Sequence, residues 1–96
     1  MKPIVFTQFL LPHGRTVATT IDRPDPIADK ASELVGAGCR LEIEMLTTGE
    51  ISMAVEHDED TWAIEIVPNG PEVPFAIDKI ICDAYHRLSR RRPRTV

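Results

Sequence analysis

Three short segments within residues 40–67 alternate apolar and polar side chains with a period of two. Every second position is apolar, and these positions are Leu41, Ile43, Met45, Ile51, Met53, Val55, Trp62, Ile64 and Ile66. Such alternation is typical of strands with one buried face. The pattern therefore predicts three strands whose nine apolar side chains share a covered face. The opposite face is expected to carry four glutamates, which are Glu42, Glu44, Glu56 and Glu65.

Short polar segments separate these three strands. Thr48-Gly49 predicts a tight turn, because glycine adopts positive φ without a steric penalty. His57-Asp58-Glu59-Asp60 predicts a longer polar loop. Strands with one covered face and short connections are typical of an antiparallel meander.

Two more strand-like segments precede the meander, at 4–11 and 16–21. Both are rich in β-branched or aromatic residues, and they flank Pro12-His13-Gly14-Arg15, which predicts a hairpin. The second arm is rich in threonine and is expected at a sheet edge. Alternation is weak here, so the register and the strand order stay open.

The remaining apolar positions have helical spacing. A first stripe follows Asp25, a good N-cap, and Pro26, and it ends before Gly36 and Gly38. Its members are Ile27, Ala31, Leu34 and Val35. A second stripe predicts a helix that begins near Val73 and fades at 90–92, before Pro93. Its members are Val73, Ile77, Ile80, Ile81, Ala84 and Leu88.

The predicted element order is β-β-α-β-β-β-α. This order predicts an α+β fold, with two helices packed on one face of a mostly antiparallel sheet. A chain of 96 residues with 43% apolar side chains fits one domain, which we place at 1–90. Residues 91–96 are expected to form a flexible basic tail.

Charge is strongly segregated along the chain, although the net charge is only −4. Residues 41–78 hold ten acidic and no basic side chains, whereas 79–96 hold six basic and one acidic. The acidic face of the predicted sheet is either a hydrated surface that prevents aggregation or a docking surface for a basic partner. With no basic residue between them, its carboxylates repel one another, which favours a compensating role in binding.

Two aromatic residues offer a second candidate contact. Phe75 lies on the polar side of the second helix together with Cys82, and Tyr85 lies at their flank. We expect Phe75 and Tyr85 to contact a partner, while packing against the N-terminal hairpin explains the pattern equally well.

The C-terminal arginines support an alternative function. Arg90, Arg91, Arg92 and Arg94 could contact the phosphates of a nucleic acid. No aromatic residues are interleaved with them for base stacking. A hydrated end of the chain and contact with the acidic face, within one chain or between two, are the other interpretations.

Catalytic and cofactor motifs are not recognised in the sequence. No HExxH, CxxC or GxSxG pattern occurs, so we expect no catalytic residues, no metal and no cofactor. Cys82 with His86 one turn later is the only concrete nucleophile and base pair, and such spacing is common without chemistry. The two cysteines, Cys39 and Cys82, are expected to be reduced thiols.

No apolar run approaches the ~20 residues of a membrane span. The N-terminal segment is also a poor signal peptide. We therefore expect a cytoplasmic protein that does not enter a membrane.

Four segments resemble a family of short bacterial proteins of uncharacterised function. They are Phe9-Leu10-Leu11-Pro12-His13-Gly14-Arg15, Ala37-Gly38-Cys39-Arg40-Leu41-Glu42, Leu46-Thr47-Thr48-Gly49-Glu50 and Ile66-Val67-Pro68-Asn69-Gly70-Pro71. The resemblance implies no activity and no site residues. The sequence predicts a non-enzymatic protein-interaction module, either a monomer or a homodimer, with nucleic-acid binding as the alternative.

Overall fold

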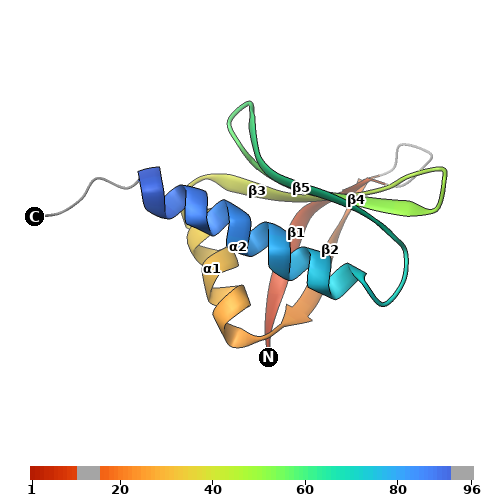
Figure 1. Cartoon of the computed structure of the whole chain (residues 1–96), viewed down its shortest axis with the longest axis horizontal. Coiled ribbons are helices and arrows are strands. Elements are labelled where there is room, and N and C mark those ends of the chain that lie inside the picture. Colours follow the sequence, from red (N-terminus) through yellow and green to blue (C-terminus); the bar gives the residue numbers. More distant parts are fainter. Residues whose placement is uncertain (11–15, 92–96) are drawn as a thin grey trace, which may run out of the picture.

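The computed structural model describes residues 1–10 and 16–91, with the side chains of 7–10 and 16–19 left out. Its helices and strands follow the predicted order, which confirms the α+β fold (Figure 1). The predicted turn at 12–15 lies outside the described residues. Of the predicted tail at 91–96, Arg91 is the last residue of a helix, and residues 92–96 lie outside the described residues. The elements are β1 (Lys2–Leu10), β2 (Thr16–Arg23), α1 (Asp25–Gly36), β3 (Cys39–Met45), β4 (Glu50–His57), β5 (Asp60–Pro68) and α2 (Val73–Arg91).

The strands form one sheet in the order β2-β1-β3-β4-β5. Neighbouring strands are antiparallel except β1 and β3, which pair in parallel from Gln8 with Glu42 to Leu10 with Glu44. The chain leaves β2 at one edge, passes through α1 and enters β3 beside β1, which produces the parallel pair. The threonine-rich strand lies at an edge, as predicted.

Both helices cover the same face of the sheet (Figure 1). α1 packs against β1 and β3, and α2 packs against β4 and β5. The core lies between these two layers, and each large side chain buried there contributes about 1.5–3 kcal/mol relative to exposure. The largest fully buried side chains are Phe6, Leu34, Leu41, Met53, Val55, Ile77, Ile80 and Ile81.

A bulge in β5 interrupts the alternation that the sequence suggests. Val55 pairs with Ala63 and Glu56 pairs with Thr61, so Trp62 is an extra residue on β5. Trp62 is buried, and Ala63 also packs against the core. Two consecutive residues thus face the helices, and every later side chain of β5 changes face.

The bulge overturns two predictions about β5. Val67 is buried, and Glu65 Oε2 lies 3.2 Å from Nζ of Lys79 on α2. Ile64 and Ile66 face the other way and are 58% and 52% exposed. The predictions that both isoleucines are covered and that Glu65 joins the acidic outer face are therefore wrong.

Of the two turns predicted between the strands of the meander, one is confirmed and the other is shorter than predicted. Gly49 has φ 89°, in the left-handed region, which confirms the predicted tight turn. His57 pairs with Asp60, so the second turn contains only Asp58 and Glu59 and is shorter than predicted. Asp58 has φ 54°, a conformation that aspartate tolerates better than most residues.

The first helix deviates slightly from its predicted limits and face. Pro24 is its N-cap and Asp25 its first residue, one position earlier than predicted. Ala28 is buried, whereas Val35, expected in the stripe, is 47% exposed. After the helix, Gly38 has φ 94°, so glycine is the residue that fits the entry to β3.

The second helix matches its predicted stripe closely. Val73 is partly buried, and the five later members of the stripe are buried. α2 is also fixed to the far end of β2, because Arg23 Nε donates a hydrogen bond of 2.7 Å to Asp78 Oδ1. A second bond runs from Arg23 Nη2 to Asp78 Oδ2, which makes the ion pair bidentate.

Candidate functional site

The face of the sheet opposite the helices is the main candidate site, and we call it the outer face. Antiparallel pairing aligns Glu42 with Ala54 and Ile64 in one row, and Glu44 with Ser52 and Ile66 in the next. Arg40 and Glu56 form a third row beside them. Carboxylates therefore border a strip of small and aliphatic side chains that the described helices do not cover.

The outer face is hollowed at its centre. The depression has a volume of about 180 Å³, and its floor includes Ala54, which is only 9% exposed. Glu42 and Glu56 are partly buried, while Glu44 is exposed. The lining residues are Glu42, Ile43, Glu44, Ser52, Ala54, Glu56 and Ile64. This arrangement can receive an apolar side chain with a cation beside it.

Arg40 neutralises part of the outer face. Its Nη2 lies 3.2 Å from Glu56 Oε2 and its Nε lies 3.4 Å from Glu42 Oε1. The hydrogen bond with Glu56 and the charge of Glu42 raise the pKa of Arg40. The interpretation that no basic residue lies between these carboxylates is wrong. Arg40 immediately precedes the acidic segment, and its side chain lies between Glu42 and Glu56.

Glu42 is the carboxylate of the outer face whose charged form is disfavoured. Burial raises the pKa of its carboxyl above the ordinary value of 4.5, and the nearby charge of Glu56 raises it further. Arg40 acts in the opposite direction without cancelling the effect. A cation that arrives from outside would therefore relieve an unfavourable charge.

The two aromatic candidates do not belong to the outer face. Phe75 is 71% exposed on α2, on the helix side of the molecule. Tyr85 is partly buried against the core, and Nζ of Lys30 lies 5.7 Å from its ring centroid. Phe75 is thus an isolated exposed ring, and Tyr85 forms part of the contact between the helices.

The arginine candidates are divided between a structural contact and the end of the chain. The guanidinium of Arg91 lies 5.3 Å from the ring centroid of Trp62, and that of Arg87 lies 5.5 Å from it. Arg90 is exposed on α2. Arg92 and Arg94 lie outside the described residues, so their role stays a prediction.

Cys82 and His86 are not joined by a hydrogen bond in the described part of the chain. Cys82 is partly buried and His86 is exposed. Cys39 is also a free thiol, and burial raises its pKa, which lowers its reactivity. Within residues 1–10 and 16–91, no three His, Cys, Asp or Glu side chains cluster as metal ligands do.

Neither described helix is long and apolar enough to cross a membrane. Comparison with known proteins gives no match to a family model, a curated protein or a solved structure. The function must therefore be argued from the site itself.

Sequence reasoning missed Arg40, Ile64 and Ile66 as outer-face residues. The segment 62–67 is apolar in both phases of a strand, because Trp62, Ile64 and Ile66 alternate with Ala63 and Val67. The sequence is therefore compatible with either set of side chains facing the core. The polar residue Glu65 favours the set with Ile64 and Ile66 in the core, which the structure shows to be wrong.

Proposed function

We propose that this chain is a small, non-enzymatic and cytoplasmic protein-interaction module whose outer face binds a partner segment with lysine or arginine beside aliphatic side chains. The observation that carries the proposal is the exposure of Ile64 and Ile66 next to Glu42 and Glu44 on a face that no described helix covers. Interfaces combine an apolar centre with a charged rim in this way.

The charge balance of the outer face supports a cationic partner. Arg40 pairs with Glu42 and Glu56, whereas Glu44 has no ion pair among the described residues. Three carboxylates and one guanidinium leave an excess of negative charge. Such a field speeds the approach of cationic segments and disfavours acidic ones.

The apolar strip supplies the second requirement. Exposed isoleucines lose water contact when a partner covers them, and each stabilises the complex by about 1.5–3 kcal/mol if fully buried. Ile64 and Ile66 lie in successive rows on the edge strand. A partner of suitable chemistry therefore gains both from burial and from charge pairing.

Affinity capture from a cell extract tests the proposal with a matched pair of variants. Glu44→Lys changes a carboxylate on the outer face, while Glu65→Lys makes the same change on the helix face. We expect Glu44→Lys and Ile64→Asn to lose the protein that wild type captures and Glu65→Lys to retain it. Retention of the same protein by Glu44→Lys and Ile64→Asn contradicts the proposal.

The negative charge of the outer face could also bind a second copy of this chain. The arginine-rich end of one copy could occupy the outer face of another, because their charges are opposite. Sedimentation at low and high salt separates this case from a foreign partner, since a dimer of this kind dissociates as salt screens the contact.

Nucleic-acid binding through Arg90, Arg92 and Arg94 stays the alternative, with Arg91 already placed over Trp62. It predicts binding that falls steeply with salt and disappears when the chain is truncated after Leu88. A gel shift at low salt checks it. No specific contact among the described residues favours this function over docking on the outer face.

A further inference from the structure

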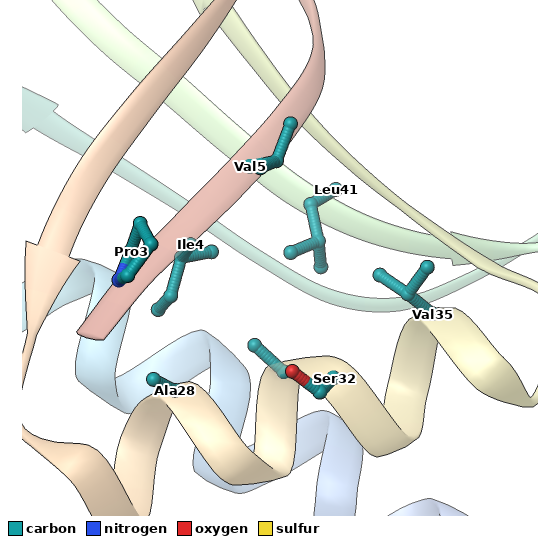
Figure 2. Close-up of a pocket in the computed structure, with 8 residues that line it drawn as sticks. Pro3, Ile4, Val5, Ala28, Ser32, Val35 and Leu41 are labelled. Carbon is teal, nitrogen blue, oxygen red and sulfur yellow. The ribbon is translucent and has the colours of Figure 1, made fainter.

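A second hollow lies on the helix side of the sheet, between α1, β1 and β3 (Figure 2). Its volume is about 340 Å³, within the range of roughly 300–1,000 Å³ that is usual for ligand sites. Ile4 and Leu41 point down toward α1, and Val35 rises from the helix toward them (Figure 2). The lining residues are Pro3, Ile4, Val5, Ala28, Ala31, Ser32, Val35 and Leu41.

The lining is aliphatic apart from one hydroxyl. Among the residues whose side chains the structure describes, Ser32 is the only polar one in the lining, and none of them is charged. Val35 is 47% exposed, so the hollow opens to solvent beside α1, whereas the side chain of Val5 points away from α1 (Figure 2). This chemistry suits an uncharged aliphatic group and disfavours ions or sugars.

The hollow lies where β1 and β3 are no longer paired. β1 pairs with β3 only from Gln8 to Leu10, whereas its first half pairs with β2 alone within the described chain. The first half of β1 therefore has one strand edge without a strand neighbour, and that edge borders the hollow. An open edge of this kind is a template for another extended chain.

Pro3 indicates which backbone groups face the open edge. It pairs with Asp22 of β2, and a proline has no N–H to give to a neighbouring strand. Proline is accepted where the missing N–H would point away from the partner. Because alternate residues direct their backbone groups to the same edge, Val5 then directs its N–H and C=O toward the open side.

We infer that this hollow binds an extended peptide segment that pairs with the open edge of β1 and inserts one aliphatic side chain between β1 and α1. The backbone of Val5 supplies hydrogen bonds to the main chain of the peptide. The aliphatic lining selects valine, leucine or isoleucine over polar side chains. This combination of edge pairing and a side-chain pocket is a known mode of peptide recognition. The site is on the helix side and does not depend on the outer face.

The test is an NMR titration of the full ¹⁵N-labelled chain with the capped peptide acetyl-Thr-Val-Thr-Val-Thr-amide. We expect saturable shifts at the amides of Val5 and Ser32. A peptide N-methylated at both valines should bind at least roughly tenfold more weakly, because it cannot donate those main-chain hydrogen bonds.

A matched pair of variants tests the pocket itself. Ser32→Leu fills the hollow from an exposed position on α1, and Ser89→Leu makes the same change on an exposed position of α2. The first should weaken binding at least roughly tenfold and the second should leave it unchanged. Thermal melts of both variants establish that each is folded.

Three results would overturn the inference. The first is the absence of saturable shifts in wild type at millimolar peptide. The second is equal binding of the N-methylated peptide, or equal binding by Ser32→Leu. The third is saturation of the same amides by hexan-1-ol without any response to the peptide, which would assign the hollow to small aliphatic molecules instead. None of these results bears on the outer face, so the proposed function is tested separately.

Discussion

The imidazole of His57 stacks on the indole of Trp62, with ring centroids 4.8 Å apart and an interplanar angle of 22°. His57 is the last residue of β4, and Trp62 is the extra residue of the bulge in β5. The stack therefore holds the bulge beside the turn that joins the two strands. Arg87 and Arg91 of α2 lie over the same indole. This cluster therefore determines which face of the sheet receives Ile64 and the residues after it.

Replacement of Trp62 should be among the most destabilising changes in the molecule. Trp62→Ala removes a buried indole and its contacts with His57 and the two arginines, at a cost of roughly 3–5 kcal/mol. Trp62→Phe should cost only about 1–2 kcal/mol, because the ring remains and the indole Nε1 has no hydrogen-bond partner among the described residues. Urea denaturation measures both. Equal losses for the two variants would contradict this account of the cluster.

The fold was largely predictable from local pattern, and the site was predictable only in part. The six-residue stripe of α2 and the alternation in β3 follow from burial on one face, and sequence spacing reports burial directly. The bulge at Trp62 also depends on contacts with Arg87 and Arg91 of α2, which are distant in sequence. The same holds for the pair of Arg40 with Glu56 on β4, which lies 16 residues further along the chain.

Threonine substitutions distinguish the two phases of β5. Ile64→Thr and Ile66→Thr should each change stability by about 0.5 kcal/mol or less, because both side chains are largely exposed. Val67→Thr should cost roughly 1–3 kcal/mol, since it buries a hydroxyl in an apolar environment. Thermal or urea unfolding provides the comparison. The reverse ranking would place the isoleucines on the covered face.

Neutralisation of Glu42 should stabilise the chain near pH 7. Its pKa is raised in the fold, so the folded state binds more protons than the unfolded state, and stability falls as pH rises above the ordinary value of 4.5. Glu42→Gln removes this loss and the repulsion from Glu56, a gain of about 0.2–1 kcal/mol. The gain should fade as pH falls toward 4.5 and be absent well below it, where the wild-type carboxyl is protonated in both states. Melting curves between pH 3 and pH 8 decide the matter, and a variant that is less stable at pH 7 would show that the pair with Arg40 dominates.

The Arg23–Asp78 pair should contribute more than the exposed pairs of the surface. Its side chains are 12% and 25% exposed, and its two hydrogen bonds are charge-assisted. A double-mutant cycle with Arg23→Gln and Asp78→Asn should give a coupling of about 1–2 kcal/mol. The exposed Lys2–Asp29 pair is the matched control and should give under about 1 kcal/mol. Similar coupling at both sites would remove the special role assigned to the link between β2 and α2.

The central claim is that a cationic and aliphatic segment binds the outer face, and calorimetric titration of a purified captured partner tests it most directly. Wild type, Glu44→Lys and Glu65→Lys are compared at equal salt, because the two variants carry the same charge change on opposite faces. We predict that Glu44→Lys weakens binding at least roughly tenfold while Glu65→Lys keeps the wild-type affinity within about twofold. Equal affinities for the two variants, whether retained or lost together, would contradict the claim.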